Sequence, residues 1–374
     1  MPDKKEKPVL FISSSPHIGS PVSTSKIMTR VIIALAPVSL FGVLLYGIPA
    51  LLTIIVSIIS AVAAEILFRK ITKQEMHYKN LSAVVTGLLL ALILPPEMPL
   101  WMTALSAFFA VIVAKEFFGG IGGNVFNPAL IGRAFALLSF PVAATHWTIP
   151  RAFFSANSSI ANTASGAVAD ALSGATTLGI VKLAVSNEVS WGAVLTAMKG
   201  AVTDVGSGFA ALGLAGGSDY WSTIQTLFLG NHGGSIGESS ILLILAGFVY
   251  LFITGTIDWR APVSMVAAVF LFSLILTKDP GFALFAILSG GVFFGAVFMA
   301  TDYVSAPLFP SGKLIFGFCA GLITVLIRQF GNYPEGVTYG ILIMNAVTPF
   351  INRIHEKKYG YVKPVKTPAA GGSK

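Results

Sequence analysis

The sequence has little charge. Only 11% of its 374 residues are Asp, Glu, Lys or Arg, whereas 55% are hydrophobic. A soluble globular domain carries about 25% charged residues, so this deficit excludes an ordinary soluble protein. The net charge of +8 does not indicate nucleic-acid binding, because the basic residues lie between apolar segments and at the two ends, as topology signals do. The composition predicts a polytopic membrane protein.

Cysteine is nearly absent from the chain. The single cysteine, Cys319, lies inside an apolar run, which excludes a disulfide framework and a thiolate metal cluster within this chain. No histidine lies at a helical or turn spacing from another, so we expect no dedicated zinc site and no intrachain iron–sulfur cluster. Cys319 is interpreted as a small buried hydrophobic residue; a site shared with another protein of a complex is the alternative.

Apolar runs of membrane-spanning length are abundant. A helix needs roughly 17–25 mainly apolar residues to cross a bilayer. We predict an all-α polytopic membrane protein with about ten transmembrane helices. The expected ranges are 27–47, 49–69, 80–96, 98–117, 127–142, 238–257, 261–277, 281–300, 313–331 and 336–352.

The distribution of lysine and arginine predicts the orientation of these spans. Most basic residues fall on the side of the N-terminal tail, so both termini are expected in the cytoplasm. The tail itself lacks a long apolar core followed by a cleavage site, and we interpret it as retained rather than as a signal peptide. The expected organisation is a cytoplasmic N-terminal tail (1–26), two membrane halves (27–142 and 238–353) separated by a long outer loop (143–237), and a cytoplasmic C-terminal tail (354–374).

A weak internal repeat is visible. Both "ALILPPEMPLWMTALSAFFAVIVAKEFFGGIGGN" and "FSLILTKDPGFALFAILSGGVFFGAVFMATD" pass from an apolar run through a proline-containing turn to a second run with Phe-Phe-Gly. Five spans per half give the halves opposite orientations, which predicts two inverted five-helix repeats with broken helices near their interface. Chance similarity between Gly-, Ala- and Phe-rich helices is the alternative. The glycines of "GGIGGN" predict a broken or re-entrant segment, and not a dinucleotide loop, because they follow an apolar helix rather than a strand.

Several charged residues lie near the ends of predicted helices. They are Glu65, Lys115, Glu116, Arg133 and Asp302. Ionisable groups at membrane depth are candidates for function, although side chains at helix ends also reach the interface. Arg133 and Asp302 follow the two copies of the possible repeat, and are therefore the stronger candidates for an ion path or a cofactor contact.

The outer loop contains a short polar stretch, "DALSGATTLG", from Asp170 to Gly179. It offers hydroxyl groups at Ser173, Thr176 and Thr177, and the small Gly174 and Ala175 leave the backbone accessible to a modifying enzyme. Asp170 lies three residues before Ser173 and offers a carboxylate to such an enzyme or to its metal. On this chemistry alone, an ordinary Ser/Ala/Gly loop is the favoured interpretation.

A family resemblance changes that interpretation. Asp170-Ala171-Leu172-Ser173-Gly174-Ala175-Thr176 resembles the acceptor pattern Asp-x-x-(Ser/Thr)-Gly-Ala-(Thr/Ser) of flavin transferases. The stretches "GGIGGNVFNPALIGRAF", "MATDYVSAPLFPSGKLIFG" and "PEGVTYGILIMNAVTPFINR" resemble the same family. Together with the ten-span plan, they are similar to the NqrB/RnfD family, whose members belong to Rnf ion-translocating electron-transport complexes and to the sodium-pumping NADH:quinone reductase. The absence of a longer N-terminal extension favours the Rnf branch.

The resemblance implies a membrane electron-transfer protein, inactive alone, in a bacterial or archaeal cytoplasmic membrane. It implies FMN joined through its phosphate to Thr176, with Asp170, Ser173, Gly174 and Ala175 completing the acceptor motif. The complex would move electrons between reduced ferredoxin and NAD⁺ and couple this transfer to Na⁺ or H⁺ movement. A non-covalent riboflavin is also implied nearer the cytoplasmic side. Asn124, Asn127 and Asp302 are candidates for flavin or ion contacts in the membrane.

The implied partners follow from the same resemblance. They are the iron–sulfur and flavin subunits on the ferredoxin and NAD side, a second covalent-FMN subunit, further membrane subunits, a flavin transferase and the lipid bilayer, with no nucleic acid. Two other interpretations remain open at this point. Inverted repeats and broken helices are also typical of a solute or ion facilitator, and a third possibility is a membrane scaffold whose partners hold all the redox centres.

Overall fold

The computed structural model describes residues 23–74, 80–147, 224, 227–230, 233–331 and 335–355. Within these ranges every regular element is a helix, as the sequence predicts. The elements before the outer segment are α1 (Thr24–Tyr46), α2 (Ile48–Thr72), α3 (Ser82–Ile93), α4 (Leu100–Ala114), η2 (Glu116–Phe118), α5 (Pro128–Ser139) and α6 (Pro141–Thr145). The elements after it are η5 (Ile236–Glu238), α12 (Ile241–Ile253), α13 (Arg260–Thr277), α14 (Pro280–Leu288), α15 (Val292–Phe294), η6 (Gly295–Met299), α16 (Pro310–Phe330) and α17 (Val337–His355).

Five of the described helical segments are long and apolar enough to cross a membrane. They are α1, α2, the segment from α4 through η2, α13 and α16. A sixth candidate is the pair formed by α14 and the α15–η6 segment, which is bent by 61° at a short break. The prediction of a polytopic membrane protein therefore agrees with the helices that the structure describes. The full count of ten spans stays a prediction.

Three apolar helices are shorter than the sequence predicts. α3 and α5 have 12 residues each, and α12 has 13. At a rise of 1.5 Å per residue, such helices extend about 18–20 Å, less than the roughly 30 Å of a hydrocarbon core. Apolar character alone could not reveal this difference, because the residues that flank these helices are apolar too.

Local sequence signals explain where several helices begin and end. Asn127 and Asp279 cap α5 and α14 with their side-chain oxygens, and a proline follows each cap at the first helical position. α3 ends just before Pro95 and Pro96, as expected from the missing amide donors. The break between α14 and α15 contains Gly290 and Gly291, both with positive φ angles that glycine tolerates.

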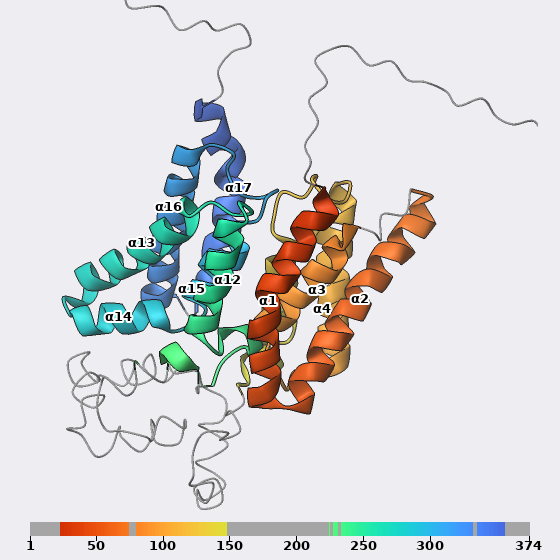
Figure 1. Ribbon diagram of the computed structural model, residues 1–374, viewed down its shortest axis with the longest axis horizontal. Coiled ribbons are helices and arrows are strands. Elements are labelled where there is room, and N and C mark those ends of the chain that lie inside the picture. Colours follow the sequence, from red (N-terminus) through yellow and green to blue (C-terminus); the bar gives the residue numbers. More distant parts are fainter. Residues whose placement is uncertain are drawn as a thin grey trace, which may run out of the picture.

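The helices pack in two groups that meet at α1 and α12 (Figure 1). In the first group α2 packs on α3 and α4, and α4 packs on α5. In the second group α13 packs on α14 and α16, and α16 packs on α17. The two groups also touch where α5 meets α17. The order of contacts is thus the same in both groups, which is the arrangement that a repeat would produce.

Small residues bring α13 and α16 together. A Cβ atom on Gly317 would lie 2.3 Å from the carbonyl oxygen of Ala261, and one on Gly321 would lie 2.6 Å from that of Met265. These two glycines are four residues apart on one face of α16. Close backbone approach at such small-residue pairs is a common way to pack helices within a membrane.

Candidate functional site

A pocket lies between the two groups of helices. We call it the central pocket; it is lined by residues of α1, α3, α5, α12 and η6 and of the segments that follow α4 and η6. It comprises about 750 Å³ of space, including the part that is open to its surroundings. Ligand sites typically occupy about 300–1,000 Å³ and combine apolar walls with a few polar groups. The central pocket has both features.

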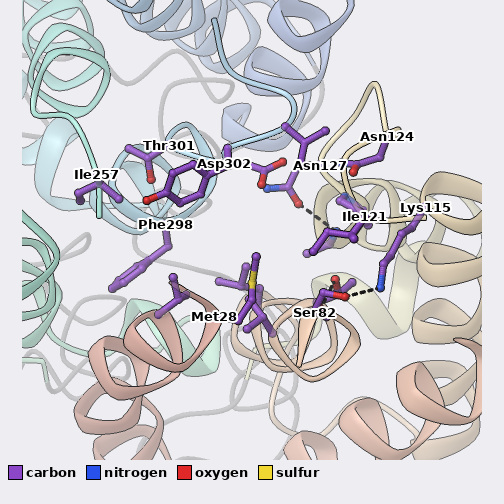
Figure 2. Close-up of a pocket in the computed structure, with 18 of the residues that line it drawn as sticks. Met28, Ser82, Lys115, Ile121, Asn124, Asn127, Ile257, Phe298, Thr301 and Asp302 are labelled. Carbon is purple, nitrogen blue, oxygen red and sulfur yellow. Dashed lines mark hydrogen bonds between the residues drawn. The ribbon is translucent and has the colours of Figure 1, made fainter. Parts of the chain in front are cut away.

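All three membrane residues singled out from the sequence line this pocket. Asn124 and Asn127 come from the segment before α5, and Asp302 follows η6, about as far along the second group of helices. Figure 2 shows Asn124 and Lys115 on one side of the pocket and Phe298 on the opposite side. The structure therefore brings Asn124, Asn127 and Asp302 to one place, and their contact with a flavin or an ion stays a prediction.

The Asn127 side chain connects the two groups of helices. Its Oδ1 accepts hydrogen bonds from the Ala129 and Leu130 amides, at 3.0 and 3.4 Å, and so caps α5. Its Nδ2 donates to the Met299 carbonyl, at 3.4 Å, at the end of η6. Asn127 is nearly fully buried, so each of these groups needs its partner.

Replacing Asn127 with alanine should lower the free energy of unfolding by about 1 kcal/mol, because α5 loses its N-cap. Asn127→Ser keeps a capping oxygen and loses the amide donor, and should recover most of this loss. Thermal unfolding of the purified protein in detergent measures both variants. Equal destabilisation by serine and alanine would contradict the capping role and point to the Met299 contact instead.

Asp302 is held by its own loop. Its Oδ2 accepts a hydrogen bond from the Ser305 hydroxyl, at 2.7 Å. Among the ion pairs of the described residues, none includes Asp302. The central pocket thus has a carboxylate on the wall that the second group of helices contributes.

Four charged side chains form a buried group beside the pocket, which we call the Lys115 cluster: Glu65, Arg69, Lys115 and Glu116. The Lys115 Nζ lies 3.2 Å from Glu65 Oε1, and the Arg69 Nε lies 3.1 Å from Glu116 Oε2. Each side chain is at most 8% exposed. Two cations and two anions balance, as buried charges require. The sequence suggested that these helix-end groups extend to the interface; the structure pairs them inside the protein.

Arg328, near the end of α16, organises the break between α14 and α15. Its guanidinium donates to the carbonyl oxygens of Ala286, Ser289 and Gly290, at 2.6, 3.0 and 3.0 Å. Its Nε also donates to the Glu335 carbonyl, at 2.8 Å. The last carbonyls of a helix have no partner within the helix, so Arg328 supplies the donors that the broken segment lacks.

Arg133 joins the two groups of helices through an ion pair. It lies within α5, is almost fully buried, and pairs with the Glu335 carboxylate just before α17. The sequence placed Arg133 at membrane depth as a candidate for an ion path, and could not identify Glu335 as its partner because 202 positions separate the two residues.

Charged side chains also meet in the connection between α12 and α13. Asp258 Oδ2 lies 2.8 Å from an Arg260 guanidinium nitrogen and 3.3 Å from the Lys313 ammonium. Partial burial alone would raise the pKa of the Asp258 carboxyl, but hydrogen bonds from Arg260 and the Lys313 charge hold it below its ordinary value. Nearby, the Tyr303 hydroxyl donates to the Thr256 carbonyl, which fixes one edge of the pocket.

Other predicted groups lie elsewhere. Cys319 is free and half-buried in α16. In the part of the chain that the structure describes, no three His, Cys, Asp or Glu side chains lie close enough together to hold a metal ion. The acceptor motif from Asp170 to Thr176, with Ser173, Gly174 and Ala175, lies outside the described residues, and its role stays a prediction.

Sequence reasoning missed two polar residues of the pocket wall. Ser82 and Thr86 line the pocket one helical turn apart on α3, a helix that is otherwise apolar and buried. Their only signal in the sequence is two hydroxyl residues four positions apart at the start of an apolar run. That signal is weak, because hydroxyl side chains in membrane helices often bond to their own backbone, as Thr86 does to the Ser82 carbonyl.

Comparison with known proteins adds an independent line of evidence. The family model described as "NQR2, RnfD, RnfE family" matches residues 11–360. The chain is 39% identical over 368 residues to the RnfD component of the proton-translocating ferredoxin:NAD(+) oxidoreductase complex of Clostridium ljungdahlii, covering 96% of this chain and 97% of the relative. It is 37% identical over 364 residues to the RnfD component of the Na(+)-translocating ferredoxin:NAD(+) oxidoreductase complex of Acetobacterium woodii, covering 96% and 98%. It is 35% identical over 350 residues to the RnfD component of the ion-translocating oxidoreductase complex of Stutzerimonas stutzeri, covering 90% and 92%.

Proposed function

This chain belongs to the NQR2, RnfD, RnfE family and is a subunit of an ion-translocating oxidoreductase, and from that premise we propose a specific role for it. It is the membrane electron-transfer subunit that carries covalent FMN in an ion-translocating ferredoxin:NAD⁺ oxidoreductase complex. Its partners are the other subunits of that complex, and its electron transfer is coupled to the movement of Na⁺ or H⁺.

The observation that carries this proposal is similarity along nearly the whole chain. Both ferredoxin:NAD(+) relatives match 96% of this sequence, including the membrane segments and the outer loop between them. The three relatives named above are oxidoreductase subunits, which favours electron transfer over a passive facilitator.

The covalent cofactor is assigned to Thr176. A flavin transferase joins the FMN phosphate of FAD to the threonine oxygen, and AMP leaves with the other phosphate. The phosphate is then held by the ester, so the loop needs no cluster of arginines to retain it. Attachment also prevents loss of a cofactor at the outer surface of the membrane. Asp170, Ser173, Gly174 and Ala175 present the acceptor threonine to the transferase.

A second, non-covalent flavin is assigned to the central pocket. Met28, Leu89 and Phe298 offer apolar surface for an isoalloxazine ring, and the buried amides of Asn124 and Asn127 offer polar partners for its edge. Riboflavin fits this donor set better than FMN does, since the one cation of the lining, Lys115, is already engaged by Glu65. When bound, a flavin stores one or two electrons, and the protein supplies its position and electrostatic surroundings.

The arrangement of the helices supports a coupling role. The equal order of contacts in the two groups supports two inverted five-helix repeats, with both termini in the cytoplasm. A charge that crosses the membrane potential changes the free energy by about 2.3 kcal/mol per 100 mV. Electron transfer between an outer FMN and an inner flavin is therefore large enough to be coupled to ion movement.

Inverted membrane vesicles test the proposed function. With reduced ferredoxin and NAD⁺, vesicles that contain the complex should form NADH and take up Na⁺ or H⁺. Vesicles from a strain that lacks this chain should do neither, and the wild-type gene should restore both. A protonophore identifies the ion, because primary Na⁺ uptake persists in its presence. Full NADH formation without this chain would contradict the proposal.

A further inference from the structure

The central pocket contains one cation that the proposed function does not use. Lys115 follows α4, lines the pocket and is only 2% exposed. Its Nζ donates to the Ser82 hydroxyl at 2.8 Å, a contact marked in Figure 2, and to Glu65 Oε1 at 3.2 Å. Ser82 lines the same pocket. The ammonium group is therefore fixed at the pocket wall by two partners.

The surroundings of Lys115 prevent the usual behaviour of a membrane lysine. A lysine near a helix end normally extends its charge toward water. Here the chain turns directly after α4 into η2, and the Lys115 Nζ also lies 3.8 Å from the Glu116 carboxylate. Charges in a poorly solvated site interact more strongly than charges in water. A ligand in the pocket would experience this fixed positive charge.

The opposite wall carries a charge of the other sign. Asp302 comes from the second group of helices and is held by Ser305, whereas Lys115 comes from the first group. Besides these two, the described lining contains Tyr303 as its one other ionisable side chain. The pocket is thus polarised, with the ammonium near Ser82 and the carboxylate near the end of η6.

We propose that Lys115 sets the reduction potential of the flavin in the central pocket, with Ser82 and Glu65 as positioning residues. This inference rests on the proposed second flavin. Two electrons from the upstream redox centres of the complex and one proton from solvent convert a neutral oxidised flavin into an anion. A nearby ammonium stabilises that anion relative to the oxidised form. Glu65 opposes this effect, because its carboxylate partly neutralises the ammonium.

The test uses the complete complex with Lys115→Met. Acid extraction measures the non-covalent flavin, because covalent FMN stays on the protein, and spectroelectrochemical titration measures its midpoint potential. We expect unchanged flavin content and at least a tenfold loss in the equilibrium for reduction. That loss is a fall of about 30 mV for a two-electron couple. Lys115→Arg should keep most of the wild-type potential, and Lys70→Met, which removes an exposed lysine outside the pocket, should change nothing.

A second variant gives an expected shift of opposite sign. Glu65→Gln removes the carboxylate that faces Lys115 and should raise the midpoint potential, so it decides the question even where Lys115→Met does not assemble. An unchanged potential in Lys115→Met or in Glu65→Gln would overturn the proposal. Loss of the extractable flavin from both Lys115→Met and Lys115→Arg would also overturn it, since Lys115 would then act in binding. A wild-type complex without extractable flavin would remove the pocket assignment itself and leave the covalent FMN of Thr176 unaffected.

Discussion

Thr176→Val should abolish the yellow fluorescence of this chain on a denaturing gel. Valine has nearly the shape of threonine but has no hydroxyl oxygen, so the FMN phosphate has no acceptor. The effect should be complete rather than partial, because the bond either forms or does not. The measurement is ultraviolet illumination of the gel after expression of each variant together with the flavin transferase.

Thr177→Val is the matched control. It removes a hydroxyl group one position away and leaves the pattern from Asp170 to Thr176 intact. Its band should remain as fluorescent as that of the wild type. A fluorescent Thr176→Val band beside a dark Thr177→Val band would mean that the transferase uses the second hydroxyl.

Arg328→Met should destabilise the protein more than any other single substitution considered above. The four carbonyl oxygens that accept from Arg328 would lose their donor within a buried site. Removing one partner from a buried charged group costs about 3–5 kcal/mol, and each unsatisfied acceptor adds to the loss. We expect the free energy of unfolding in detergent or nanodiscs to fall by about 3 kcal/mol or more, with the broken segment of α14 and α15 losing order first.

Two variants distinguish this role from a general effect of charge. Arg328→Lys keeps the positive charge but reaches fewer carbonyl oxygens, and should fall between the wild type and Arg328→Met. Arg353→Met removes an exposed arginine near the end of α17 and should unfold like the wild type. Wild-type stability of Arg328→Met in both detergent and nanodiscs would contradict the role assigned to its guanidinium.

Much of the helical architecture could be predicted because its signals are local. Asn127-Pro128 and Asp279-Pro280 mark helix starts, and Pro95-Pro96 marks a helix end, each through the hydrogen bonds of a few neighbouring residues. The lengths of α3, α5 and α12 could not be predicted in this way. Whether an apolar residue belongs to a helix or to its buried flanking segment depends on the helices packed around it, and hydropathy is the same in both cases.

The site shows the same division. Asn124, Asn127 and Asp302 could be identified from polar residues at the ends of a repeated pattern, and the structure brings them to one pocket. Lys115 was visible as a charge but not as a pocket residue, because its direction depends on Ser82 and Glu65, which lie on other helices. Glu335 could not be linked to Arg133 for the same reason. Pairing between distant segments is a tertiary property that no local pattern records.

Mass spectrometry of the fragment that spans Ser173 to Leu178 tests most directly whether this protein carries electrons on its own flavin. The complex should be isolated from cells that contain the flavin transferase and then digested with chymotrypsin. The predicted result is a fragment heavier by the mass of FMN less one water, with fragmentation that localises the phosphoester to Thr176. An unmodified fragment as the main species, from a complex that forms NADH from reduced ferredoxin, would contradict this role.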